Sequence, residues 1–129
     1  MTALLEQIIA SGNRRFDPAN LHIGDNNIQC ADGYTMSVIA GEGCYCTPRP
    51  DRYGVLGNAP GDYPGPYSHV EVGFPSARPE PWEKWQPLAD GLGDDDRALW
   101  LTVYGYVPVE LVRELVAAHG GEVTRNDPP

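Results

Sequence analysis

The stretch from Ala98 to Ala118, ALWLTVYGYVPVELVRELVAA, contains the clearest strand and the clearest helix signals of this sequence. Its first ten residues alternate between two faces, which predicts a half-buried strand. Pro108 then suits the first position of a helix, and Gly120-Gly121 ends that helix. One strand face holds Leu99, Leu101, Val103 and Val107 in line with Gly105, the other holds Trp100, Thr102, Tyr104 and Tyr106, and the buried helix stripe holds Leu111, Val112, Leu115 and Val116.

The beginning of the chain predicts a helix, a loop and a hairpin. Residues 2–11 repeat apolar side chains at helical spacing, with Thr2 as the N-cap. Residues 13–26 have the composition of a loop. Asp32-Gly33 is a two-residue turn signal between the predicted strands 27–31 and 34–40. That register places Ile28 and Cys30 opposite to the apolar face of the second strand, so either a bulge or apolar cover on both faces is needed.

The middle of the chain predicts a long loop, a strand and a helical turn. Residues 41–66 are crowded with Gly and Pro and carry several Tyr, which is typical of an ordered loop packed by its own side chains. Tyr67 to Phe74 alternates, with Val70, Val72 and Phe74 on one face. Glu80 to Trp85 predicts one helical turn.

Together these elements predict an α+β fold. We expect an antiparallel sheet of about four strands, with an N-terminal and a C-terminal helix on one face and long Gly/Pro-rich loops. A chain of 129 residues fits one domain. We place that domain at residues 1–121 and a flexible tail at residues 122–129.

Composition excludes some classes of partner. The net charge of −9 argues against nonspecific binding to nucleic acid and against an anionic membrane surface. The first residues lack a basic, apolar signal sequence, and no apolar run approaches the ~20 residues of a membrane helix. Three cysteines without a secretion signal indicate reduced thiols in a cytoplasm.

The face of the sheet that the helices leave uncovered is rich in aromatic side chains, and three arginines flank it. Aromatic rings with a few guanidinium groups suit a nucleotide-like ligand, and they suit a protein interface equally well. The third interpretation is that the loops fold over this face and bury it as a second small core. The candidate ligand-binding residues are Tyr67, His69, Glu71, Trp100, Tyr104 and Tyr106 on the strands, and Arg49, Arg52 and Arg78 in the loops.

Catalysis has weaker signals in the sequence. No nucleophile, phosphate-binding or zinc-protease motif is present, so we name no catalytic residue, metal ligand or cofactor. His69 and Glu71 share one side of their predicted strand and could act as acid and base. The alternative function is therefore a small metal- or thiol-dependent hydrolase that uses this pair with Cys44 or Cys46.

Three segments resemble a family of small actinobacteriophage proteins of unknown function. They are YTMSVIAG at 34–41, GPYSHVEVGFPSARPEPW at 65–82 and VYGYVPVELVR at 103–113. The resemblance implies an accessory protein in the cytoplasm of an infected bacterium. Such a protein would counter host defence by blocking a host protein or by sequestering a nucleotide second messenger. We expect a non-enzymatic binding protein, and a homo-oligomer.

Overall fold

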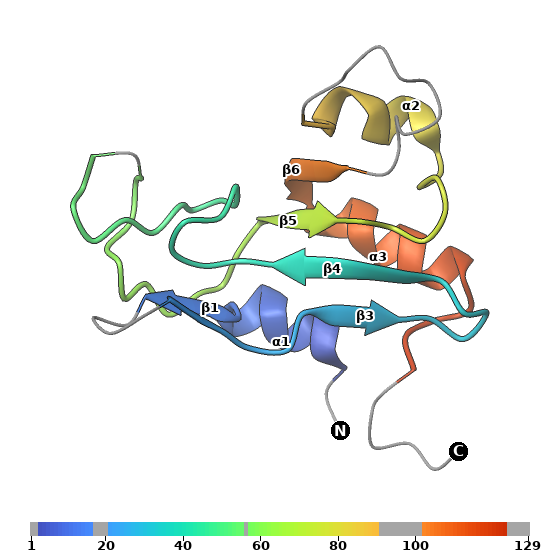
Figure 1. Cartoon of the computed structure of the whole chain (residues 1–129), viewed down its shortest axis with the longest axis horizontal. Helices are drawn as coiled ribbons and strands as arrows, with labels where there is room; N and C mark the ends of the chain where they lie inside the picture. Colours follow the sequence, from blue (N-terminus) through green and yellow to red (C-terminus); the bar gives the residue numbers. More distant parts are fainter. Residues whose placement is uncertain (1–2, 17–20, 56, 91–101, 124–129) are drawn as a thin grey trace.

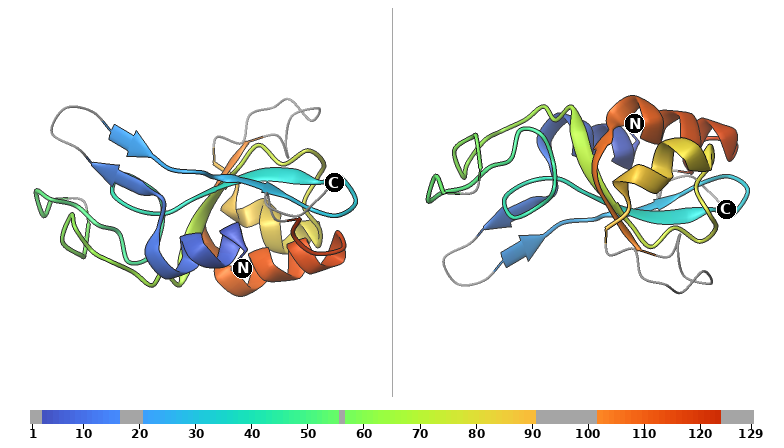
Figure 2. Two further views of the ribbon diagram at one scale, coloured as in Figure 1. Left: turned by 90° about the horizontal axis from the view of Figure 1, so that it is seen from below. Right: turned by 90° about the horizontal axis from the view of Figure 1, so that it is seen from above.

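The main element of the structure, a computed structural model, is a four-stranded antiparallel sheet (Figure 1). The structure describes residues 3–16, 21–55, 57–90 and 102–123. The strand order is β3 (Asn27–Gln29), β4 (Thr35–Ile39), β5 (His69–Gly73) and β6 (Val103–Pro108). Helices α1 (Leu4–Ser11) and α3 (Val109–Ala118) lie on the same side of this sheet (Figure 2). The predicted α+β fold is confirmed.

Two short helical segments follow β5. Helix α2 (Trp82–Trp85) and the 3-10 turn η1 (Gln86–Leu88) lie beyond the outer edge of β6 (Figure 1). The helical turn that the sequence predicted at 80–85 is thus present. None of the helices in the described ranges has the length and apolar character that crossing a membrane requires.

A second, two-stranded sheet lies where the sequence predicted a loop. β1 (Arg14–Phe16) pairs antiparallel with β2 (Leu21–Ile23), so the prediction for residues 13–26 is wrong. Asn13 explains the entry into this hairpin. Its side-chain amide donates to the carbonyl of Val38 at 2.8 Å, and its side-chain oxygen accepts from the N–H of Ala40 at 3.0 Å. These long-range hydrogen bonds have no local signature in the sequence.

The turn between β3 and β4 contains three residues, one more than the sequence suggested. Ile28 lies opposite Met36, and the N–H of Cys30 donates to the carbonyl of Tyr34 at 2.8 Å. Gly33 takes the left-handed conformation, with φ 97°, that closes a three-residue hairpin turn. The third turn residue, Gly33, forms a bulge, which is one of the two alternatives that the sequence left open; with it Ile28 and Cys30 point into the core together with Met36.

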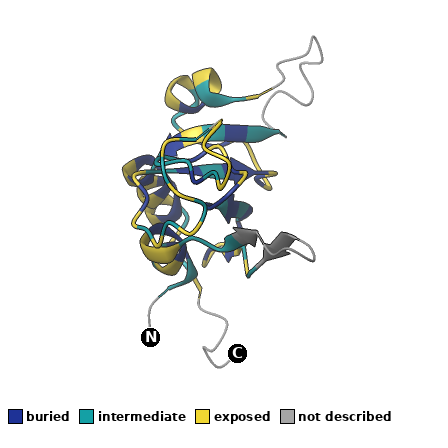
Figure 3. Ribbon diagram, turned by 90° about the vertical axis from the view of Figure 1, so that its left-hand side faces the viewer, coloured by how far each residue is buried: buried dark blue, intermediate teal, exposed yellow. Residues whose placement is uncertain are grey.

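The core lies between the sheet and its two helices. Figure 3 shows that the helices turn their exposed residues away from the sheet. The predicted stripe of α3 is buried in full, together with Val109. Other core residues come from α1 and from all four strands of the main sheet. They include Leu5, Ile8 and Ile9 of α1, Ile28 of β3, Met36 and Val38 of β4, Val70 and Val72 of β5, and Tyr104 and Val107 of β6.

Strand β6 carries a bulge where it pairs with β5. Val72 lies opposite Tyr104 and Val70 lies opposite Val107, so two residues of β6 face the single residue Glu71. A bulge of this kind interrupts the alternation of side chains between the two faces. As a result Tyr104 and Val107 both point into the core, and both are fully buried.

The same bulge separates Tyr104 from Tyr106. Tyr106 takes a left-handed conformation, with φ 53°, and its side chain is 43% exposed. The prediction that Tyr104 and Tyr106 share one face is therefore wrong, because it extended a regular alternation through Gly105. Phe74 also departs from the predicted alternation, because the sequence predicts it on the same face as the buried Val72. Phe74 has φ 50° and is 64% exposed.

The segment after α3 is attached to the rest of the domain at residues 122 and 123. The carboxylate of Glu122 accepts hydrogen bonds from the N–H groups of Leu4 and Leu5 at 2.8 and 3.0 Å. The N–H of Val123 donates to the carbonyl of Gln29 at 2.8 Å. These two residues, which belong to the tail that the sequence predicts, cap α1 and extend the edge at β3; the remainder of the predicted tail lies outside the described residues.

A candidate binding groove beside Tyr106

A groove of about 630 Å³ lies between the end of β6, the α2–η1 segment and the first turns of α3. Its apolar surface comes from two prolines and two leucines, and its polar groups come from α2, α3 and the start of β5. The lining consists of His69, Glu83, Lys84, Pro87, Leu88, Tyr106, Pro108, Glu110, Leu111 and Glu114. An apolar surface with a few polar groups is the usual composition of a binding site.

Tyr106 enters the groove because of the bulge. A left-handed backbone costs about 1–2 kcal/mol for a residue with a side chain, so this conformation is retained against its own preference. Two contacts with Tyr45 hold Tyr106 in this conformation. The N–H of Tyr106 donates to the carbonyl of Tyr45 at 3.0 Å, and the two rings lie 5.8 Å apart. Strained residues of this kind concentrate at functional sites.

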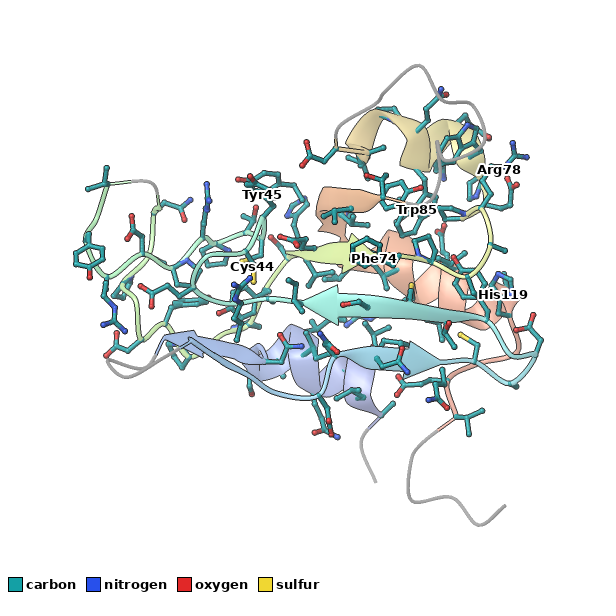
Figure 4. The ribbon with its side chains drawn as sticks, in the orientation of Figure 1. Cys44, Tyr45, Phe74, Arg78, Trp85 and His119 are labelled. Atoms are coloured by element: carbon teal, nitrogen blue, oxygen red, sulfur yellow. The ribbon has the colours of Figure 1, made fainter. Side chains whose placement is uncertain are left out.

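Gly105 makes the approach of Tyr45 possible. A Cβ atom at position 105 would lie 3.2 Å from the Cβ of Tyr45, which is tighter than ordinary van der Waals contact. The N–H of Tyr45 also donates to a carboxylate oxygen of Glu71 at 2.9 Å. The loop that contains Tyr45 is thereby fixed over the bulge, on the sheet face that the helices do not cover (Figure 4).

The outer wall of the groove is fixed by two buried aromatic side chains. Trp85 and Tyr104 are fully buried, and their rings meet edge to face with 5.4 Å between the centroids. Burial raises the pKa of the Tyr104 hydroxyl to about 12. The N–H of Asp90 donates to the carbonyl of Val103 at 2.7 Å. These contacts attach the α2–η1 segment to the outer edge of β6, so the groove is bounded by packed elements.

The groove has an excess of negative charge. Glu83, Glu110 and Glu114 contribute three carboxylates, against the single ammonium group of Lys84. Glu110 and Glu114 are one helical turn apart on α3 and both are exposed. Among the residues that the structure describes, none of these three carboxylates forms an ion pair. A cationic group in the groove would therefore meet three carboxylates of which only Glu110 interacts electrostatically with a nearby arginine, Arg113, among the described residues.

Of the predicted aromatic-face residues that the structure describes, His69 and Tyr106 line this groove. The Oγ atom of Ser68 lies 2.8 Å from Nδ1 of His69, which is hydrogen-bonding distance. Tyr67 is buried and meets Tyr63 edge to face at 5.5 Å. Tyr104 is in the core, Glu71 is bonded to the Tyr45 backbone, and Trp100 lies outside the described residues. The predicted residues therefore do not form one surface: some line the groove, some are buried, and Glu71 holds the loop that contains Tyr45.

The three predicted arginines do not line the groove. The guanidinium carbon of Arg49 lies 5.1 Å from the centre of the Tyr45 ring. Arg52 contacts the buried carboxylate of Glu42 at 3.4 Å. Arg78 contacts Glu80 at 3.0 Å. The structure does not bring these arginines together as a phosphate clamp.

The residues of the alternative hydrolase are separated by burial. Cys44 and Cys46 are both fully buried. Burial raises the pKa of Cys44 to about 12 and also raises the pKa of Cys46, so both thiols are held in the protonated, poorly nucleophilic form. His69 and Glu71 form no hydrogen bond with each other, and within the described ranges no three His, Cys, Asp or Glu residues cluster as metal ligands.

Sequence reasoning missed most of the groove. Its acidic residues lie on the solvent-facing side of α3 and α2, where charged residues are normally only solvating. The one available signal was the i, i+4 pair Glu110 and Glu114 beside Leu111, directly after a strand that ends in Tyr106. That signal becomes informative only once η1 is known to lie opposite α3.

Comparison of the chain with protein-family models, with curated proteins and with solved structures found no match.

Proposed function

We propose that this protein binds a partner protein in the groove beside Tyr106 and catalyses no reaction. The observation that carries the proposal is the exposed, left-handed Tyr106 in the lining of a partly apolar groove. Exposed aromatic rings next to apolar pockets are the residues that dominate protein–protein recognition. The raised pKa values of Cys44 and Cys46 favour binding over the thiol-dependent hydrolase.

A protein partner is favoured over a nucleotide second messenger. The arginines that would have held phosphate groups contact Tyr45, Glu42 and Glu80, and the groove itself carries carboxylates. Phosphate beside carboxylate is a like-charge contact that costs binding energy. The resemblance to small actinobacteriophage proteins supports a host protein as the partner and host defence as the process affected. The expected homo-oligomer stays a prediction for light scattering.

The experiment compares two matched aromatic substitutions. Asn tolerates the left-handed conformation, so Tyr106→Asn and Phe74→Asn both remove an exposed ring without adding backbone strain. Tyr106 lines the groove, whereas Phe74 lies at the opposite end of β5 from Tyr45 (Figure 4). Both variants should keep the melting temperature of the unmodified protein within a few degrees, since neither ring belongs to the hydrophobic core.

Tagged protein would be used to capture partners from a bacterial lysate. We expect the unmodified protein and Phe74→Asn to retain the same partner in stoichiometric amount, and Tyr106→Asn to lose it. Retention by all three proteins would contradict the groove as the binding site. Denaturing the purified protein and analysing released small molecules by mass spectrometry provides the second arm, in which a bound nucleotide would contradict the proposal of a protein partner.

A further inference from the structure

We infer that the groove accepts a basic side chain of the partner, Arg or Lys, flanked by apolar residues of the same segment. This inference deepens the proposed function and rests on it. It starts from the composition of the lining, in which Glu83, Glu110 and Glu114 border a surface formed by Leu88 and Leu111. The combination selects a ligand that is both cationic and apolar.

Charge complementarity supplies the first argument. Glu110 and Glu114 stand one turn apart on α3, and Glu83 approaches from α2 on the other wall. The nearest arginine on α3, Arg113, forms its hydrogen bonds with Glu6, at 3.0 and 2.8 Å, and has only a longer-range electrostatic interaction with Glu110. Carboxylates on two walls, with no ion pair in the described chain, match a guanidinium or ammonium group that enters from a partner.

The apolar and aromatic part of the lining supplies the second argument. The aliphatic stems of Arg and Lys pack along apolar surface while their charged heads reach polar groups. Leu88, Leu111 and Pro108 offer such a surface, with Leu111 buried and the other two partly exposed. The ring of Tyr106 adds a partner for cation–π contact. A lone metal ion would leave this apolar surface unused.

A displayed library of random peptides tests the inference without knowledge of the natural partner. The library would be selected on the unmodified protein, and the enriched peptides would be measured against Tyr106→Asn, Phe74→Asn and the double variant Glu110→Gln with Glu114→Gln. We expect Arg or Lys beside an apolar residue to be enriched several-fold over the input. Affinity should fall about tenfold or more in Tyr106→Asn, and about threefold to tenfold in the double variant, while Phe74→Asn binds normally.

The possible outcomes separate the inference from the proposed function. Some peptides could depend on Tyr106 and yet show no excess of Arg or Lys, or bind the double variant unchanged. Either result would overturn the inference that a basic side chain enters the groove, and would leave the groove as the binding site. Selection that yields no peptide dependent on Tyr106 would overturn both. Affinity that falls as salt concentration rises is the further result expected of a charged contact.

Discussion

The carboxylate of Glu122 accepts a hydrogen bond of 2.8 Å from the backbone N–H of Leu4, although the two residues stand 118 positions apart. A second bond of 3.0 Å, from the N–H of Leu5, completes the cap. Helix α1 has no capping side chain of its own, because its N-cap residue is Ala3. The segment that follows α3 therefore stabilises the start of α1.

Substitution of Glu122 should reveal this cap. We expect Glu122→Ala to lower the free energy of unfolding in urea by about 1 kcal/mol, the usual cost of a lost N-cap. The matched control is Glu114→Ala, which removes an exposed carboxylate that accepts no backbone hydrogen bond in the described chain and should change stability by less than about 0.5 kcal/mol. Equal losses in both variants would show that the effect is one of net charge.

Acid should weaken the contact between α3 and the β3–β4 turn. Nδ1 of His119 lies 2.7 Å from Oδ2 of Asp32, and the His119 ring stacks on Tyr34 with centroids 4.0 Å apart. The hydrogen bond to His119 lowers the pKa of Asp32 below its ordinary value of 3.8, helped by the N–H of Tyr34. Figure 4 places His119 at the far end of α3 from the groove.

The sign of the pH effect follows from that lowered pKa. Because the folded pKa lies below the unfolded one, the stabilisation is complete above pH 3.8 and is lost as pH falls through the folded value. We expect Asp32→Asn to be less stable than the unmodified protein at neutral pH, and the difference to shrink in thermal melts taken toward about pH 3. A difference that stays constant across this range would refute the assignment to Asp32.

Trp85 should be the most sensitive position of the groove wall. Its side chain is fully buried against Tyr104, so Trp85→Ala should cost about 3–5 kcal/mol. Its indole N–H has no hydrogen-bond acceptor within the described chain. Trp85→Phe therefore loses packing only and should cost about half as much as Trp85→Ala in urea unfolding. A cost of Trp85→Phe equal to that of Trp85→Ala would indicate a hydrogen bond.

The cysteines should be unreactive in the folded protein. Cys30 is buried like Cys44 and Cys46, and desolvation raises the pKa of all three thiols. At about pH 8 we expect a thiol reagent to label the native protein slowly and to label all three cysteines once guanidinium unfolds it. Fast labelling of Cys44 or Cys46 in the native protein would revive the thiol-dependent hydrolase as a candidate.

The arrangement of strands and helices could be predicted from the sequence because it depends on local periodicity. The helical stripe of α3 and the alternation around Val70 and Val72 are properties of neighbouring residues. The three-residue turn at Gly33 was misassigned by a single residue, and that shift reversed the predicted orientation of Ile28. A period of two residues makes every such shift a complete exchange of faces.

The candidate site could be predicted only in part, because it depends on one bulge and several long-range contacts. The sequence around Gly105 does not indicate that Tyr104 points into the core and Tyr106 away from it. The ion-pair partners of Arg52 and Arg78 could not be predicted either, because the sequence does not indicate which carboxylate an arginine contacts. Of the residues that aromatic composition pointed to, Tyr106 and His69 line the groove, whereas Tyr104 lies in the core.

We propose that a partner occupies the groove beside Tyr106. The direct measurement is a two-dimensional NMR titration of the labelled protein with a peptide obtained from the random library. We expect chemical-shift changes at Tyr106, Leu111 and Glu114, with Phe74 and the turn at Gly33 unchanged. Shifts that cluster in the loop around Tyr53, or that persist in full in Tyr106→Asn, would contradict it.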